Sequence, residues 1–276
     1  MIEDIKIAYY QKDIAWGNRQ SNYDDVEKEM AKIKDEEVDL LILPEVFATG
    51  FCSKNIYDFS ESEYGETFEW MQQLSKNYNT VVLGSCFVKN TNGNIYNTLY
   101  MVYPSGNFDI YNKRHLFRLG AEYKELSSGV ATESFLVKGW KIAPYICYDL
   151  RFPAWMRNSF VSPSDFKYDI CVVVANWPSK RMDAWKKLLE ARAIENMSYV
   201  VGVNRVGKDP DGISYSGESR VIDYKGNVIS SIDPNEAKLS VTSLSYQKLK
   251  YFRECMPFYL DWDRIEINDS YNKSDR

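Results

Sequence analysis

Short apolar runs rich in Val, Ile and Leu recur along the 276-residue chain, with helix-forming stretches between them. The runs that read as strands cover residues 4–10, 38–43, 80–88, 97–103, 141–148, 168–175 and 199–204. Three of them are almost continuously apolar, which is typical of strands buried on both faces. The sequence therefore predicts sheets that are covered by helices.

Helices are predicted between these strand runs. Asn18 or Ser21 is expected to cap a helix that reaches about residue 37, and a second helix covers about residues 65–78. Pro153 fits the first turn of a helix that follows the run 141–148. Asp183 is expected to cap a helix that extends to about residue 197.

The C-terminal third has a different pattern. Residues 219–230 alternate around Lys-Gly-Asn and predict a hairpin, after which a strand and a short helix reach about residue 253. The predicted class is α/β (α+β), with a mixed sheet or with two sheets back to back. No repeat or linker divides the chain, so we expect one domain over residues 1–276 with a tail from about residue 254.

Charge and hydropathy limit the partners of this chain. Its net charge of −5 disfavours nucleic acid and also anionic membrane surfaces. The first residues lack the basic and apolar regions of a signal peptide, and no run approaches the ~20 apolar residues of a membrane span. We therefore expect a cytoplasmic protein that binds neither nucleic acid nor a membrane.

Cysteine and histidine counts limit the chemistry. The chain has 5 cysteines and no CxxC pair, which argues against a disulfide framework and leaves a thiol free to react. His115 is the only histidine, so the chain has too few histidines for a zinc site built from clustered His and Cys ligands. A Cys–His or Ser–His–Asp hydrolase would have to use His115.

Several predicted strands end in a polar residue, and ligands of such sheets bind beyond the strand ends. Glu45 follows the run 38–43, Cys147 ends the segment KIAPYIC within the run 141–148, Asn176 follows the run 168–175, and Asn204 ends the run 199–204. A further alternating segment, NFDIYNKRH, brings Lys113 to its end.

Each candidate also has a structural interpretation. Most cysteines are buried as small hydrophobes, but Cys147 stands where an apolar strand meets a proline-started helix, whose N-terminus would favour the thiolate. On residue type alone, Glu45 reads as a solvated loop residue and Lys113 as part of a surface basic cluster. These residues are far apart in sequence, so spacing alone cannot show that they meet.

Three ordered motifs carry a family resemblance. LPEVF around Glu45, NKRHLF around Lys113 and ICYDLRFP around Cys147 resemble the three catalytic boxes of the nitrilase (carbon–nitrogen hydrolase) superfamily. VANWP, ARAIEN, NRVG and SGESRVID resemble its later blocks, so the resemblance covers about residues 4–253. Within the superfamily, the chain looks most like the omega-amidase branch, which hydrolyses 2-oxoglutaramate and 2-oxosuccinamate.

The resemblance implies a four-layer αββα sandwich of two mixed sheets, usually paired into a homodimer through a helical face. It implies no metal and no organic cofactor. It also implies a second glutamate after the lysine box. Glu122 matches this position best because it lies seven residues before Gly129, and Glu125 is the competing assignment.

The resemblance also assigns catalytic roles. Cys147 is expected to attack the amide carbonyl, Glu45 to act as general base, and Lys113 to be the cation held by Glu45 and Glu122. Lys113 and the backbone N–H of Tyr148 are expected to stabilise the oxyanion.

Substrate recognition is expected to need an arginine, because a 2-oxo acid amide carries a carboxylate. Arg181 is the first candidate and Arg118 the second, although a structural ion pair ranks ahead for each of them. The residues expected to line the substrate pocket are Asn176, Trp177 and Phe117. Three other charged residues read as scaffold ion pairs, namely Arg151, Arg192 and Glu195.

Three rival hypotheses stay open. Another carbon–nitrogen hydrolase (a nitrilase, an N-carbamoyl amidohydrolase or an aliphatic amidase) would share the same Glu-Lys-Cys triad. A catalytically idle binding protein on this fold is the second rival. A Cys–His hydrolase that uses His115 is the third.

Overall fold

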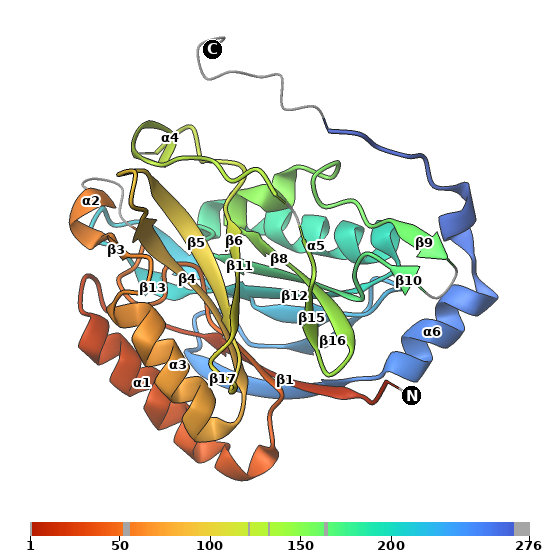
Figure 1. The fold of residues 1–276 in the computed structure, drawn as a ribbon, viewed down its shortest axis with the longest axis horizontal. Helices are drawn as coiled ribbons and strands as arrows, with labels where there is room; N and C mark the ends of the chain where they lie inside the picture. Colours follow the sequence, from red (N-terminus) through yellow and green to blue (C-terminus); the bar gives the residue numbers. More distant parts are fainter. Residues whose placement is uncertain (1, 52–55, 121, 132, 163–164, 268–276) are drawn as a thin grey trace.

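The computed structural model describes residues 2–51, 56–120, 122–131, 133–162 and 165–267. Cys52 lies outside this range. Two large mixed sheets and six helices make up most of the described chain (Figure 1), which agrees with the predicted class.

The first sheet has 7 strands. Its order is β17 (Lys238–Leu244), β1 (Ile5–Gln11), β2 (Leu40–Ile42), β4 (Val81–Lys89), β5 (Ile95–Val102) and β6 (Phe108–Asn112), and β3 (Glu61–Ser62) pairs with β4. The strands β1, β2 and β4 are parallel, whereas β17, β5 and β6 join by antiparallel pairing.

The second sheet has 6 strands. Its order is β16 (Val228–Ser231), β15 (Arg220–Ile222), β12 (Tyr199–Asn204), β11 (Ile170–Ala175), β8 (Trp140–Ile146) and β7 (Phe135–Val137). The strands β8, β11 and β12 are parallel. The antiparallel pair β15–β16 confirms the hairpin predicted over 219–230. Two short ladders complete the strands, β9 (Phe160–Ser162) with β10 (Asp165–Phe166) and β13 (Val206–Lys208) with β14 (Ser214–Ser216).

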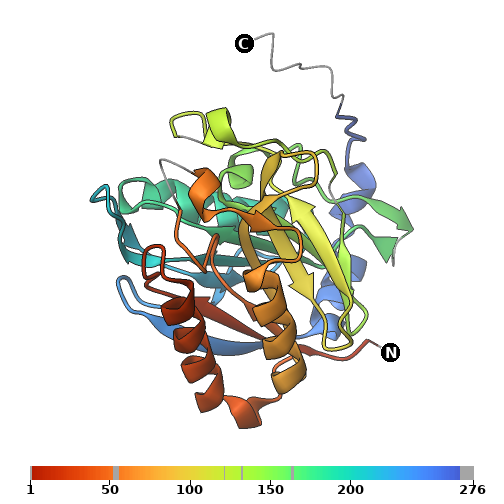
Figure 2. The same ribbon diagram turned by 60° about the vertical axis from the view of Figure 1, so that its left-hand side comes forward.

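The two sheets pack against each other, and helices cover their outer faces. Strand β1 shows how the period of two divides its side chains. Ile7 and Tyr9 join the core between the sheets, while Ala8 and Tyr10 join a second core beneath α1 (Arg19–Lys32) and α3 (Glu66–Tyr78). On the other side, α5 (Met182–Asn196) packs on β12. Figures 1 and 2 show the resulting αββα layering.

Helix boundaries follow the predictions in part. Asn18 caps α1 by accepting from the backbone N–H of Ser21, but α1 ends at Lys32 and a 3₁₀ turn follows it. Helix α3 lies where it was predicted. The short helices α2 (Ile56–Phe59) and α4 (Glu122–Glu125) lie in connecting loops, and α6 (Tyr246–Cys255) matches the last predicted helix.

Two predicted helix starts were wrong. Pro153 begins no helix, because the chain turns already at Cys147 into a 3₁₀ segment, Cys147–Arg151, and continues in turns. Asp183 does not cap α5: Arg181 holds the N-cap position, and Asp183 lies in the first turn, where it pairs with Lys187 four residues later.

Along the described ranges, no helix has the length and apolar character that crossing a membrane requires.

Candidate active site

The carboxyl ends of strands from both sheets meet at one edge of the sandwich. Glu45 follows β2, Cys147 follows β8 and Asn176 follows β11. Lys113 follows β6, which runs in the direction of β4 because both pair antiparallel with β5. The alternation of buried strands and polar ends in the sequence therefore brings distant residues to one place.

Glu45 is fully buried, and the turn that carries it is held from both sides. Its Oε2 accepts from the backbone N–H of Asn176 at 2.8 Å, and its carbonyl accepts from Asn176 Nδ2 at 2.6 Å. The next residue, Val46, has a φ of 48°, a strained value for a β-branched residue. Its N–H donates to Ser85 Oγ at 2.9 Å. Ser85 and Asn176 thus fix the direction of the Glu45 carboxylate.

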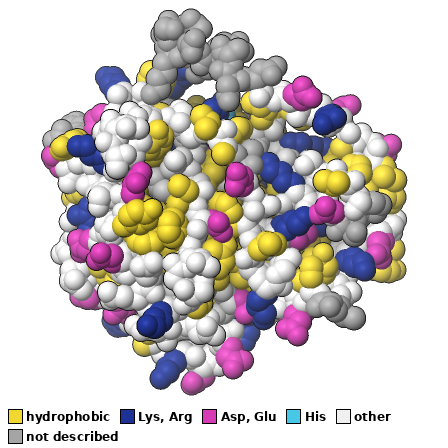
Figure 3. Space-filling model, viewed as in Figure 1, with side chains coloured by type: hydrophobic (Ala, Val, Ile, Leu, Met, Phe, Trp, Pro, Cys, Tyr) yellow, Lys and Arg dark blue, Asp and Glu magenta, His cyan; other side chains and the backbone are white. Residues whose placement is uncertain are grey.

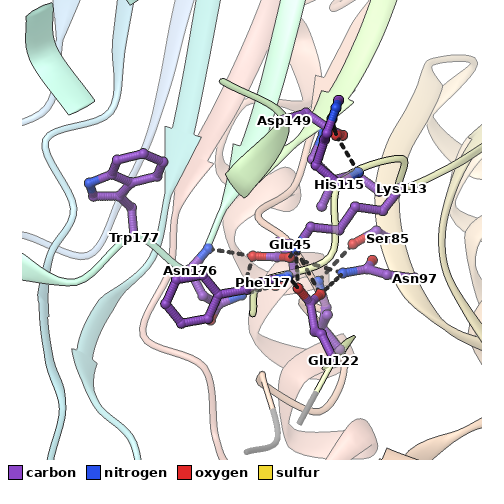
Figure 4. Close-up of polar contacts among 12 residues, drawn as sticks. Glu45, Ser85, Asn97, Lys113, His115, Phe117, Glu122, Asp149, Asn176 and Trp177 are labelled. Atoms are coloured by element: carbon purple, nitrogen blue, oxygen red, sulfur yellow. Dashed lines mark hydrogen bonds and ion pairs between the residues drawn. The ribbon is translucent and has the colours of Figure 1, made fainter. Parts of the chain in front are cut away.

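Lys113 is 1% exposed, and its ammonium lies between two carboxylates. Nζ is 2.9 Å from Glu45 Oε1 and 2.7 Å and 2.9 Å from the two carboxylate oxygens of Glu122 (Figure 4). Burial alone would lower the pKa of Lys113, but the charges of Glu122 and Glu45 outweigh it, so its pKa lies above the ordinary value. Lys113 is therefore a permanent cation in this site.

Glu122, rather than Glu125, faces this lysine. Its Oε2 also accepts from the backbone N–H of Phe117 at 2.8 Å. Burial raises the pKa of Glu122, and the charge of Lys113 opposes that shift. Glu125, one turn further along α4, instead accepts from the backbone N–H of Ile56 at 2.8 Å.

Cys147 has a φ of 45° at the junction between β8 and the 3₁₀ turn. Buried Asp149 holds this junction: it accepts from the backbone N–H of Ile146 at 3.1 Å and from that of His115 at 2.9 Å. The turn therefore presents the Cys147 side chain in a conformation that non-glycine residues rarely adopt.

The thiol lies in the field of the charged cluster. Burial and the negative charge of Glu45 raise the pKa of Cys147 well above its ordinary value, while Lys113 acts in the opposite direction. The expectation that a helix N-terminus would favour the thiolate was wrong, because a five-residue 3₁₀ turn follows Cys147 and burial dominates. The resting side chain is a neutral thiol, so attack on a carbonyl requires a base to take its proton.

Glu45, Lys113 and Cys147 line the same pocket. Its lining includes Glu45, Lys113, Cys147 and Tyr148, and also Phe51, Phe117, Leu119, Gly120, Arg151, Asn176, Trp177, Pro178, Arg181, Asp209, Ile213 and Tyr215. The spatial convergence that the sequence could not show is therefore present. A neutral thiol, a carboxylate and a fixed ammonium at one apolar-walled pocket suit acyl transfer.

The arginines follow the sequence predictions in part. Arg181 lies over the Phe117 ring at 5.2 Å and lines the pocket, whereas Arg118 lies over the Tyr123 ring at 4.7 Å, outside the lining. Arg151, interpreted from sequence as a scaffold ion pair, lines the pocket and lies over the Trp177 ring at 4.8 Å. In the described part of the chain it forms no ion pair.

The remaining charged candidates behave as scaffold. Arg192 pairs with Glu195 at 2.8 Å, as the sequence suggested. His115 stacks on Phe152 at 3.7 Å, its Nδ1 lies 2.8 Å from Asp149 Oδ1, and it is absent from the pocket lining. This placement gives no support to a Cys147–His115 pair.

Sequence reasoning missed three polar residues near the cluster. Ser85 and Asn97 lie inside the apolar runs of β4 and β5, and Asp149 lies two residues after Cys147. A buried polar residue within an otherwise apolar strand was the available signal for the first two.

Metal ligands do not gather in the described part of the chain: no three side chains from His, Cys, Asp and Glu are grouped as a metal ion would need.

Known proteins match most of this chain. The carbon–nitrogen hydrolase family matches residues 6–254. Omega-amidase YafV of Escherichia coli K12 is 35% identical over 95% of this chain and 98% of its own length. The 2-oxoglutaramate amidase of Bacillus subtilis is 30% identical over 92% of this chain and 96% of its own.

Solved structures agree. XC1258 from Xanthomonas campestris, a CN-hydrolase superfamily protein with an arsenic adduct in its active site, superposes with a TM-score of 0.92. It is 36% identical, and the match covers 96% of this chain and 99% of XC1258. The chain therefore belongs to the carbon–nitrogen hydrolase (nitrilase) family and is a hydrolase of carbon–nitrogen bonds other than peptide bonds.

Proposed function

We propose that this chain is an omega-amidase, which hydrolyses the terminal amide of short 2-oxo-dicarboxylic acid monoamides to the 2-oxo acid and ammonia. The substrates proposed are 2-oxoglutaramate and 2-oxosuccinamate. The observation that carries the proposal is the meeting of Glu45, Lys113 and Cys147 at one pocket. The named activities of the E. coli and B. subtilis relatives support the choice of substrate.

In the proposed reaction, the thiol of Cys147 attacks the amide carbonyl while Glu45 takes the thiol proton. The tetrahedral intermediate collapses as Glu45 returns that proton to the departing ammonia, and a thioester on Cys147 remains. Glu45 then takes a proton from water, which attacks the thioester. As the second tetrahedral intermediate collapses, Glu45 gives this proton to the departing sulfur of Cys147, and the 2-oxo acid and the free thiol result. A base is needed because the raised pKa of Cys147 keeps the thiol protonated at rest.

Negative charge develops on the carbonyl oxygen in both tetrahedral intermediates. Lys113, fixed by Glu45 and Glu122, is the proposed cation beside this oxygen, and the backbone N–H of Tyr148 is the proposed second donor. Prepositioned donors of this kind are worth about 3–4 kcal/mol each in comparable sites. Glu122 takes no part in proton transfer in this scheme. Its proposed role is to hold Lys113 in place.

The free carboxylate of the substrate needs a cation at the other end of the pocket. Arg181 is the proposed partner because it lines the pocket over Phe117 and forms no ion pair within the described ranges. Trp177 and Phe117 are the proposed walls, and Asn176, which donates its backbone N–H to Glu45, lines the same pocket. Arg118 is a weaker candidate, since its guanidinium lies over Tyr123.

Ammonia release tests the proposal. The purified chain is assayed with 2-oxoglutaramate, glutamine, a nitrile and a carbamoyl amino acid, beside its Cys147→Ala variant. We expect 2-oxoglutaramate to be the best substrate and the variant to be inactive with an intact fold. Preference for a nitrile or a carbamoyl compound would assign the chain to another activity of the family. Full activity of the variant would refute the mechanism.

Carboxylate recognition has its own test. Arg181→Ala should raise the KM for 2-oxoglutaramate roughly tenfold, the low end for a charged hydrogen bond because Arg181 is exposed. Lys180→Ala, its exposed neighbour outside the pocket lining, is the matched control. An unchanged KM in Arg181→Ala would remove Arg181 from the site.

We also propose a cytoplasmic homodimer. The thiols of Cys86, Cys147, Cys171 and Cys255 are free, which suits a reducing compartment. Large exposed apolar side chains follow α6, among them Phe258 (58% exposed) and Leu260 (61% exposed). Figure 3 shows hydrophobic side chains along the edge of the molecule where α6 lies. Light scattering after size exclusion tests the dimer, and a monomer mass would refute it.

A further inference from the structure

Asn97 is a buried polar residue in the middle of an apolar strand, and the proposed reaction gives it no part. It lies in β5, opposite Phe87 of β4, with 1% of its surface exposed. Its backbone carbonyl accepts from the N–H of Lys113 at 2.9 Å. The strand thus sets Asn97 directly beside the charged cluster, although Asn97 does not line the pocket.

The side-chain amide of Asn97 faces both carboxylates. Nδ2 donates to Glu45 Oε1 at 2.9 Å and to Glu122 Oε1 at 3.4 Å (Figure 4). The same two oxygens lie 2.9 Å and 2.7 Å from Lys113 Nζ. Two carboxylate oxygens therefore share two donors, one charged and one neutral. The amide oxygen cannot take the place of Nδ2, because it would face two negative oxygens.

The amide oxygen of Asn97 also indicates that Nδ2 is the atom that matters at this position. Asn97 Oδ1 is buried and has no protein donor in the described part of the chain. A buried acceptor without a donor destabilises the fold, so Oδ1 does not stabilise this side chain in its place. Its favourable contacts come from the two hydrogen bonds that Nδ2 donates.

Charge balance explains why an amide suits this place. With Glu45 and Glu122 both ionised, two carboxylates around the one ammonium of Lys113 leave the cluster with one negative charge. A second ammonium at position 97 would neutralise that charge and weaken Glu45 as a base. An apolar side chain would leave two buried carboxylates facing each other with a single donor between them. A neutral donor avoids both outcomes.

We propose that Asn97 is a positioning residue that holds Glu45 and Glu122 around Lys113 without cancelling the negative charge that makes Glu45 a base. The inference rests on the proposed role of Glu45 in amide hydrolysis. It adds a residue that acts through the carboxylate of Glu45, which it contacts, and that does not line the substrate pocket.

The test uses two variants and a control. Asn97→Leu removes both polar ends at nearly constant volume. Asn97→Asp keeps the shape and adds a third carboxyl group to the cluster. Asn94→Asp is the matched control, because Asn94 is exposed in the turn that precedes β5. For each, kcat and KM for 2-oxoglutaramate are measured against pH, and thermal melting checks the fold.

We expect kcat of both Asn97 variants to fall about tenfold or more, and KM to stay within about twofold because Asn97 is outside the pocket lining. The acidic limb of the kcat profile should move to higher pH, further in Asn97→Asp than in Asn97→Leu. Asn94→Asp should behave as the wild type. Unchanged kcat and an unchanged limb in both variants would overturn the inference.

Alkylation of Cys147 by iodoacetamide separates this inference from the proposed function. The added charge in Asn97→Asp should slow alkylation at a given pH, since nearby negative charge already raises the pKa of this thiol. If the wild type releases no ammonia from any amide, the proposed function fails. The pH profile of Cys147 alkylation still tests whether position 97 belongs to the charged cluster. Identical profiles for wild type and Asn97→Asp would overturn its placement in the cluster. If Asn97→Leu does not fold, Asn97→Asp carries both measurements.

Discussion

Removing the cation from the buried cluster is the perturbation whose effect the structure defines best. In Lys113→Met, the carboxylates of Glu45 and Glu122 lose the ammonium that lies 2.9 Å and 2.7 Å from them. Breaking a buried pair by removing one partner costs about 3–5 kcal/mol of the free energy of unfolding. Both carboxylates have 0% exposure, so solvent does not compensate the loss. We expect this magnitude at pH 8.

The loss should depend on pH with a defined sign. Burial already raises the pKa of Glu122 above its ordinary value, and the charge of Lys113 is what opposes the shift. In Lys113→Met that pKa rises further, so the folded variant binds a proton that the unfolded chain releases. Stability is then present below the unfolded pKa and is lost as pH rises through the folded pKa. The destabilisation should therefore be small near pH 5 and largest at pH 8.

Urea unfolding of wild type and Lys113→Met at pH 5 and pH 8 measures both effects. Lys187→Met is the matched control, because Lys187 also forms an ion pair, at 2.8 Å with Asp183, but on the exposed surface; its stability should change little at either pH. Adding Glu122→Gln to Lys113→Met should recover part of the loss. Equal destabilisation at both pH values, or none at pH 8, would refute the account of the cluster.

Further predictions concern the turns and the thiol. Ser85→Ala should lower the free energy of unfolding by about 1–3 kcal/mol, measured in urea, because the buried N–H of Val46 loses its acceptor; an unchanged midpoint would contradict this. Alkylation of Cys147, followed on its own peptide, should keep accelerating above the pH at which an exposed thiol levels off, because its pKa is raised; a plateau at neutral pH would show a thiolate. Asp149→Asn should lower kcat for 2-oxoglutaramate with KM unchanged, because Asp149 holds Ile146 beside the thiol but does not line the pocket; an unchanged kcat would show that the turn holds without it.

The apolar strand runs in the sequence predicted the fold class. The three central residues, Glu45, Lys113 and Cys147, were assigned through the family resemblance of the motifs around them, because residue type alone favoured a structural role for each. In the structure, Glu45, Lys113 and Cys147 follow β2, β6 and β8, and the carboxyl ends of these strands lie at one edge of the sandwich. The sequence favoured Glu122 over Glu125 only through its spacing to Gly129, and helix geometry could not separate them, because residues three apart in a helix share a face. Only the position of α4 shows which of the two meets Lys113.

Other features depend on contacts that no local pattern contains. Asn97 and Ser85 read as ordinary strand residues, since their partners lie on other strands. The course of the chain at Pro153 was mispredicted because Asp149 had already turned it. The raised pKa of Cys147 follows from burial and from a carboxylate about 100 positions earlier in the sequence. These are tertiary effects, and propensity or spacing does not report them.

The most direct test of the mechanism is acid quenching of the wild type during turnover of 2-oxoglutaramate, followed by mass spectrometry of its peptides. The account predicts that the peptide with Cys147 gains the mass of the substrate less ammonia, and that hydroxylamine removes this adduct as it does a thioester. Rapid turnover with no adduct on Cys147, or an adduct on another residue, would contradict it.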